Sequence, residues 1–125
     1  MADKLVMMLL NTTPERPHEC GAPFFQAAAA AAMDIEVEIY FAGKSAALLK
    51  KGVAEKLYPS DGGDKSIYAF MKDAADLGVK FYACGGALTG HGICAGDLIA
   101  ECAGAAGGAA YMARVMDDEW KVLSY

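Results

Sequence analysis

The chain has 125 residues, 55% of them hydrophobic, and a formal net charge of −5. This length fits one domain with its own core, spanning residues 1–125. The acidic balance argues against nucleic acid as a partner, because a negative surface repels phosphate backbones. No apolar stretch approaches the roughly 18 residues that a membrane span needs.

A continuous apolar run at residues 5–10 predicts a strand buried on both faces. The polar residues that follow it argue against a signal peptide. Residues 11–18 predict a loop, and residues 19–33 predict a helix in which Pro23 is tolerated near the first turn. The alanine run at 27–32 offers no polar face. We therefore expect this helix to be buried.

Alternation of apolar and charged residues at 35–39 predicts a second strand, half exposed to solvent. Ser45 is expected to cap a short helix that runs to Lys51, and residues 53–58 continue it. Residues 60–64 are glycine-rich and predict a surface loop.

Asp64 or Ser66 then caps a helix whose apolar residues recur at i, i+3, i+4 and i+7. Gly78 stands where a helix ends on glycine. The apolar positions of this helix are Ile67, Phe70, Met71 and Ala74.

A third strand at residues 79–83 ends directly on Cys84, and a helical turn follows near residues 87–90. The remaining predicted elements are a strand at 98–103, a helix at 105–117 and a strand at 120–124.

Strands that alternate with helices predict an α/β fold, in which helices cover both faces of a parallel-rich, five-stranded sheet as an α/β/α sandwich. Right-handed crossovers bring the carboxyl ends of the strands to one edge, where ligands bind in such folds. Two loops at that edge then matter most, residues 11–20 and 84–94.

Cys84 is the sharpest candidate for chemistry because it ends a strand just before a helical turn. We expect the backbone N–H groups of Gly85, Gly86 and Ala87 to point at its sulfur. The helix dipole favours a thiolate there by only about 0.3–1 kcal/mol. The alternative is a buried, inert cysteine, since free cysteine is among the most buried residue types.

Other polar residues of the two loops are possible auxiliaries. His91 can stabilise a thiolate or exchange protons, although we expect it to matter less than the N–H groups beside the sulfur. Arg16 and His18, in the first loop, can attract an anionic or sulfur-bearing substrate. For each of these three, the alternative is an ordinary solvated or hydrogen-bonded loop residue.

The other cysteines are scattered and form no C-x-x-C pair, so we expect reduced thiols and a cytoplasmic protein. Cys20 is a possible resolving thiol near the start of the first helix, Cys94 is a possible partner for Cys84, and Cys102 is expected in the core. Metal binding is a weak interpretation, because structural zinc sites normally bring close cysteine pairs. We therefore expect no metal and no cofactor.

The sequence resembles the DsrE/DsrF-like family of small sulfurtransferases and sulfur-relay proteins. No single motif is specific, and the resemblance depends on order and spacing over nearly the whole chain. It is carried by residues 13–17 with 23–33, by 37–41 with 47–52, and by 78–84 with Gly92-Ile93.

The resemblance implies a DsrEFH-like, Rossmann-like fold and a thiol, Cys84, that receives sulfane sulfur as a persulfide and passes it to or from a TusA-like carrier. It also implies homo- or hetero-oligomers, commonly trimers or hexamers. The chain departs from the family in having Gly85-Gly86 after the cysteine, where bulkier or polar residues are expected. This departure leaves the thiol more open.

Two other classes of function remain open from the sequence. One is a non-catalytic subunit that builds an oligomer or binds a small ligand in the same cleft. The other is a thiol redox sensor that uses Cys84 with Cys94 or Cys20. The high apolar fraction favours a homo-oligomer in any of these cases.

Overall fold

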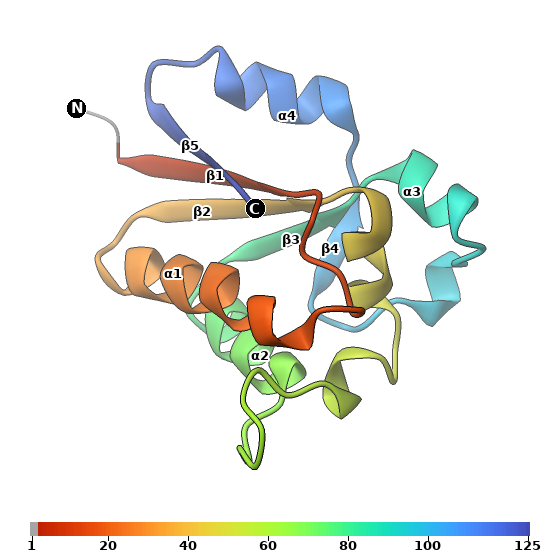
Figure 1. The fold of residues 1–125 in the computed structure, drawn as a ribbon. Coiled ribbons are helices and arrows are strands. Elements are labelled where there is room, and N and C mark those ends of the chain that lie inside the picture. Colours follow the sequence, from red (N-terminus) through yellow and green to blue (C-terminus); the bar gives the residue numbers. More distant parts are fainter. Residues whose placement is uncertain (1–2) are drawn as a thin grey trace.

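The computed structural model describes residues 3–125. Its five strands are all parallel and lie in the order β4-β3-β2-β1-β5 (Figure 1). The strands are β1 (Lys4–Leu9), β2 (Glu36–Phe41), β3 (Lys80–Ala83), β4 (Cys102–Ala105) and β5 (Trp120–Ser124).

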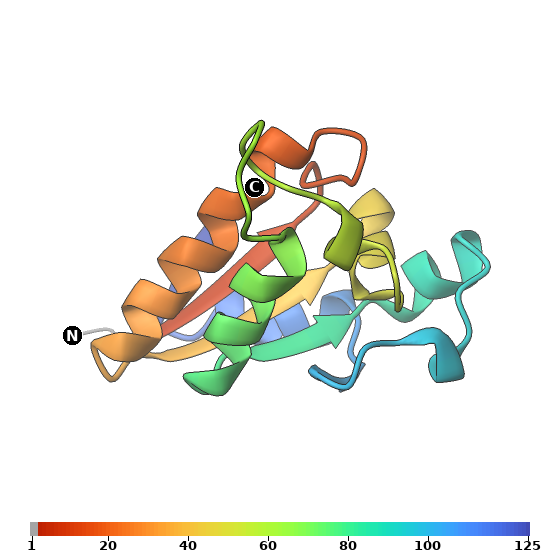
Figure 2. The same cartoon turned by 90° about the horizontal axis from the view of Figure 1, so that it is seen from below.

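Helices cover both faces of this sheet, which confirms the predicted α/β fold. Helices α1 (Gly21–Ala32) and α2 (Ile67–Asp76) lie on one face, and α4 (Gly108–Val115) lies on the other (Figure 1). Helix α3 (Gly85–Gly90) projects from the carboxyl edge of the sheet, away from α1 and α2 (Figure 2). Within the described residues, no helix is long and apolar enough to cross a membrane.

The main core lies between the sheet and the α1–α2 layer. Its centre is an aromatic cluster in which Phe24 of α1 packs on Phe41 of β2 and Phe81 of β3, with ring centroids 5.5–6.0 Å apart. All three side chains are fully buried. Burying a phenylalanine is worth about 1.5–3 kcal/mol, so this cluster anchors α1 to the two neighbouring strands.

Several local predictions are confirmed. Ser66 caps α2, since its hydroxyl accepts a hydrogen bond from the Ala69 N–H at 3.2 Å. Gly78 follows that helix at φ +101°, a conformation that suits glycine. The last predicted strand is β5, Trp120–Ser124.

The prediction that the first helix is buried is wrong. Phe24 and Ala27 are buried, but Phe25, Ala29 and Ala32 are exposed on its outer side. Because alanine is small, it is tolerated on both the buried and the exposed face of a helix, so a run of alanines does not show which face is buried. The helix lies on the sheet through one face only, and nothing among the described residues covers the other.

The prediction of a half-exposed second strand is also wrong. Residues 37–41 of β2 are all buried, and Glu38 is only 3% exposed. The Arg114 side chain of α4 donates to both Glu38 carboxylate oxygens at 3.1 and 3.3 Å, and the Tyr40 hydroxyl donates at 3.1 Å. A buried carboxylate is tolerable when it is paired and hydrogen-bonded in this way.

The region around Ser45 also differs from the prediction. Ser45 lies inside a 3-10 segment, Gly43–Leu49, and its hydroxyl donates to the carbonyls of Leu9 and Ala42 at 2.7 Å instead of capping a helix. A separate turn, Ala54–Lys56, replaces the expected continuation.

The fourth strand lies further along the chain than the predicted 98–103, at Cys102–Ala105, and the last helix is shorter than predicted. Strand β4 begins only at Cys102, because residue 99 does not pair with β3. Its N–H instead donates to the Leu49 carbonyl at 2.8 Å. Helix α4 begins only at Gly108 and ends at Val115, since the paired glycines at its start disfavour the helix before that point.

Helices α1 and α2 end in the same backbone motif with different residues. After α1, the N–H groups of Asp34 and Ile35 donate to the carbonyls of Ala31 and Ala30. After α2, Gly78 and Val79 bond in the corresponding way. Both motifs need a left-handed residue, which is Asp34 at φ +63° in the first and Gly78 in the second. Asp34 therefore carries a conformational cost that Gly78 avoids.

We predict that Asp34→Gly raises the free energy of unfolding by about 0.5–1 kcal/mol, because it relieves this cost and removes a negative charge from a helix C-terminus. The matched control, Gly78→Ala, should lower the free energy of unfolding by about 1–2 kcal/mol. Urea denaturation of both variants measures the two effects. A loss of stability in Asp34→Gly would show that its carboxylate makes a contact that outweighs the strain.

Candidate functional site

Hydrogen bonds between neighbouring strands fix the carboxyl edge of the sheet. The Ala42 N–H donates to the Leu9 carbonyl, and the Cys84 N–H donates to the Phe41 carbonyl, both at 3.0 Å. The last residue of β2 therefore holds Cys84 at the end of β3. This is the position that the sequence predicted for it.

Cys84 is the N-cap residue of α3, with an extended backbone at φ −68° and ψ 122°. Its carbonyl accepts from the Leu88 N–H at 3.1 Å, and Leu88 packs against the main core. The side chain of Cys84 is partly exposed. A cysteine in this position has a fixed backbone and a sulfur that a small substrate can reach.

The two glycines after Cys84 keep its surroundings open. A Cβ atom added at Gly85 or Gly86 would meet no neighbouring atom, and neither residue has positive φ. Larger side chains therefore fit at both positions. The backbone at these positions does not require glycine.

We expected the N–H groups of residues 85–87 to donate hydrogen bonds to the Cys84 sulfur. In the described part of the chain, residues 3–125, these bonds are not formed. A neutral thiol is a weak acceptor, so it gains much less from capping a helix than a serine or aspartate oxygen does. In this state the helix start contributes only its dipole to the thiol.

His91 is the C-cap residue of α3, so it lies at the other end of that helix from Cys84. Seven residues of helix rise place their backbones about 10 Å apart. His91 lines a hollow of about 180 Å³ with Ala47 and with Thr13, Pro14 and Glu15 of the first loop. The structure thus joins the two predicted loops, but it brings His91 to the first loop and not to the thiol.

Lys44 also lines this hollow, and the sequence reasoning missed it. Its ammonium lies 2.9 Å from the Glu15 carboxylate, and this hydrogen bond lowers the pKa of Glu15. The sequence could have indicated Lys44 through its position just after a strand, at the carboxyl edge of the sheet. That signal was obscured because the strand was predicted to end at residue 39, two residues before its true end at Phe41.

Arg16 and His18 lie in the first loop as predicted, but both already have partners. Arg16 pairs with Glu19 at 2.7 Å and donates to the Asn11 carbonyl at 2.7 Å. His18 contacts Asp61 at 3.0 Å. These pairs are exposed, so the charges are available to a substrate only in competition with their neighbours.

The four cysteines are free and differ in exposure. Cys20 is completely buried, and burial is the main cause that raises its pKa to about 11. Its thiol donates to the carbonyls of Thr13 at 3.3 Å and Arg16 at 3.5 Å. This environment does not suit a resolving thiol, because it holds the sulfur protonated and out of reach.

Cys94 is exposed, and its backbone N–H donates to the Asp97 carboxylate at 3.0 Å. Cys102 is only partly buried at the start of the edge strand β4, whereas the sequence predicted it in the core. Within the described residues, no group of three or more side chains is arranged to hold a metal ion.

A family model described as the DsrE/DsrF-like family matches residues 4–125. No curated relative matches the sequence significantly. The fold is similar to that of the ychN protein from E. coli, with a TM-score of 0.77, 12% identity and 100% of both chains covered. It is also similar to MTH1491, a protein of unknown function from Methanobacterium thermoautotrophicum, with a TM-score of 0.66, 13% identity and 98% of both chains covered.

The chain therefore belongs to the DsrE/DsrF-like family. Membership implies a general role in sulfur relay.

We predict that Cys20 resists alkylation in the folded protein while Cys84 and Cys94 react. A thiol of pKa about 11 is only about 0.1% ionised at pH 8, and Cys20 is also inaccessible. Its iodoacetamide labelling should be slower by about 100-fold or more, measured by peptide mass spectrometry. Unfolding in urea is the control and should abolish the difference. Comparable rates in the folded protein would show that the first loop opens readily.

Proposed function

We propose that this member of the DsrE/DsrF-like family is a sulfurtransferase or sulfur carrier that holds sulfane sulfur as a persulfide on Cys84. The observation that carries the proposal is the placement of a free, partly exposed thiol at the carboxyl end of β3, on the N-cap of α3. Ligands of parallel α/β sheets bind at this edge.

The transfer step is a thiol exchange that needs no separate oxidant. The Cys84 thiolate attacks the outer sulfur of a persulfide or polysulfide donor, and a bond forms between Sγ and that sulfur. The sulfur–sulfur bond of the donor breaks, and the donor leaves as a thiolate. The proton of Cys84 goes to solvent before attack. The reverse sequence passes the sulfur to an acceptor thiol.

The other cysteines are less suited to this role. Cys20 is buried and protonated, and Cys102 lies beside the Gly104 carbonyl on the edge strand. Cys94 is the closest competitor because it is exposed. It lies on a 3-10 turn away from the end of a strand, so it serves as the matched control for Cys84.

The hollow beside His91 does not include Cys84, but it lies at the same carboxyl edge of the sheet. Lys44 brings a cation to the carboxyl edge, where anionic donors such as polysulfide would approach. Because Glu15 pairs with Lys44, the attraction is moderate and depends on ionic strength.

We further propose a TusA-like carrier as the exchange partner, a homo-oligomeric assembly and a cytoplasmic location. Four free thiols agree with a reducing compartment. For assembly, the second face of the sheet offers large apolar side chains to solvent on α4 and the edge strand β5. These are Met112, Met116 and Val122.

The first prediction from this proposal concerns the sulfur-bearing residue. After incubation with polysulfide, intact-mass measurement should show one added sulfur atom that dithiothreitol removes. Cys84→Ser should abolish the addition, whereas Cys94→Ser should retain it. Retention in Cys84→Ser together with loss in Cys94→Ser would move the carrier function to the 3-10 turn. Loss in both variants would favour a redox pair instead.

The second prediction concerns assembly. Light scattering at micromolar concentration should show a homo-oligomer, with a trimer as the preferred state. Met112→Lys with Met116→Lys should lower the mass, because charges on an apolar interface are left unpaired. Leu77→Lys, on the opposite layer, is the control and should leave the mass unchanged. A monomeric parent protein would refute the assembly but not the thiol chemistry.

A further inference from the structure

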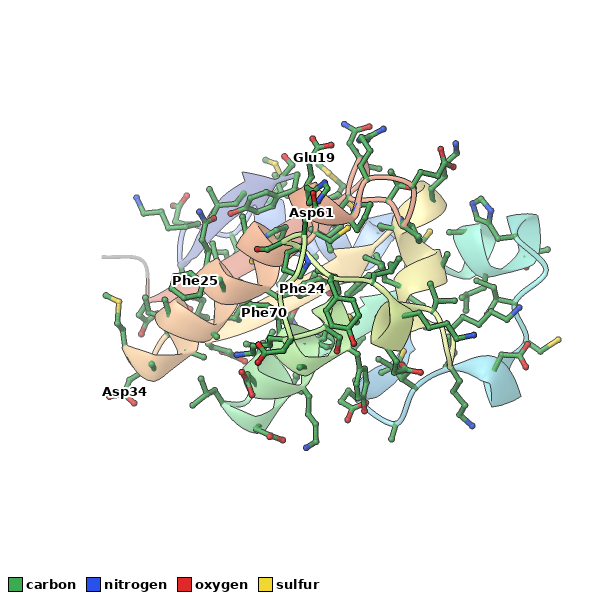
Figure 3. All side chains as sticks on the ribbon, turned by 60° about the horizontal axis from the view of Figure 1, so that its bottom comes forward. Glu19, Phe24, Phe25, Asp34, Asp61 and Phe70 are labelled. Carbon is green, nitrogen blue, oxygen red and sulfur yellow. The ribbon has the colours of Figure 1, made fainter. Side chains whose placement is uncertain are left out.

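A second hollow, of about 530 Å³, lies far from Cys84 in the groove between α1 and α2. Figure 3 shows Phe24 and Phe25 on α1 and Phe70 on α2, next to this groove. None of its lining residues belongs to the carboxyl-edge segment 84–94. The lining residues are Phe24, Phe25, Ala28, Ala29, Lys65, Phe70, Asp73, Asp76 and Leu77.

The groove exists because small residues on α1 face large ones on α2. Ala28 and Ala29 lie opposite Phe70 and Leu77 and do not fill the space between the helices. Phe25 is 65% exposed and forms an apolar wall. The volume lies within the range of about 300–1,000 Å³ typical of small-molecule sites.

The groove already holds one cation against an aromatic ring. The Lys65 ammonium lies 4.3 Å from the centroid of the Phe70 ring and 2.5 Å from the Asp73 carboxylate. This is the geometry of a cation–π contact backed by an ion pair. Lys65 thus shows which chemistry this part of the groove accommodates, and its side chain is 47% exposed.

The lining as a whole carries more negative than positive charge. Asp73 and Asp76 are three residues apart and therefore share one face of α2. Lys65 is the single cation among the lining residues. Lys72 contacts Asp76 more loosely, at 3.3 Å, from outside the groove. Helix α1 contributes no charged residue at all. When Lys65 leaves, these carboxylates would attract another cation in its place.

We propose that the α1–α2 groove is a binding site for a small organic cation, an ammonium group carried on an aromatic or alkyl body. The body packs along Phe25 and Leu77. The ammonium lies at Asp73 and Asp76 beside the Phe70 ring, taking the place that Lys65 holds in the free protein. This inference does not depend on the proposed sulfur chemistry.

Three matched probes test the proposal: phenylbutylammonium, the neutral alcohol phenylbutanol and the anion phenylbutyrate. Titrations followed by ¹H–¹⁵N NMR should shift the amide signals of α1 and α2. We expect the ammonium probe to bind about 5- to 10-fold more tightly than the alcohol, because it adds a cation–π contact and an exposed ion pair. The carboxylate should bind most weakly.

Four variants separate the parts of the site. Asp76→Asn and Phe70→Leu should each reduce the preference for the ammonium probe about 3-fold. Lys65→Ala should tighten its binding, because the internal competitor is removed. Ala29→Leu fills the groove from an exposed helix position and should abolish binding of all three probes while the protein stays folded. Asp118→Asn, outside the groove, is the control and should change nothing.

Equal affinity for the three probes, or tighter binding of the anion, would overturn the proposal. So would the absence of amide shifts on α1 and α2. If Leu77→Lys dissociates the assembly, a second copy of the chain covers the groove, and the proposal also fails. Each of these outcomes leaves the persulfide assignment of Cys84 untouched, since that assignment is tested by mass alone.

Discussion

The position of Cys84 depends on a short series of backbone hydrogen bonds that continue the parallel sheet one residue past its strands. Leu9, Phe41 and Ala83 each end a strand, and their carbonyls accept from residues that already belong to the next segments: Ala42, Cys84 and Ala106. The Ser45 hydroxyl adds a second donor to Leu9. Because buried carbonyls must be paired, this register is costly to change. The backbone hydrogen bonds of the sheet therefore fix the position of Cys84, and no contact of its own side chain is needed.

An ion pair between a buried carboxylate and a partly exposed arginine attaches the second helical layer to the same sheet. Arg114 of α4 reaches Glu38 on β2, and its guanidinium also lies 4.7 Å from the centroid of the Trp120 ring on β5. Burial, followed by the charge of Glu38, raises the pKa of Tyr40 to about 12, so its hydroxyl stays a hydrogen-bond donor across the physiological range. Such pairs contribute little net stability, but they specify which way a layer docks. The rest of this face is thinly covered, which leaves methionines of α4 and the edge strand in solvent.

Sequence reasoning succeeded where the signal was local. Ser66, Gly78 and the strand 120–124 each show their role within a few residues, through a cap, a left-handed turn or an apolar run. It failed where the deciding partner is distant. The acidic Glu38 indicates an exposed strand until Arg114 is placed beside it, 76 residues further along the chain. The place of Cys84 followed from a topological rule, whereas the burial of Cys20 depends on a loop folding over it.

The groove between α1 and α2 has the same origin as the error about the alanine-rich helix. Composition shows that this helix can be buried on every side, but the strand order decides how many neighbours it has. Strand β5 lies at the edge of the sheet beside β1, and the helix that precedes it, α4, lies on the opposite face. Within residues 3–125, no third α-helix therefore joins α1 and α2, and the outer face of α1 stays open. The same topology that directs Cys84 to one edge leaves an apolar, acid-lined groove on the helical layer, so the two sites are physically separate and open to independent ligands.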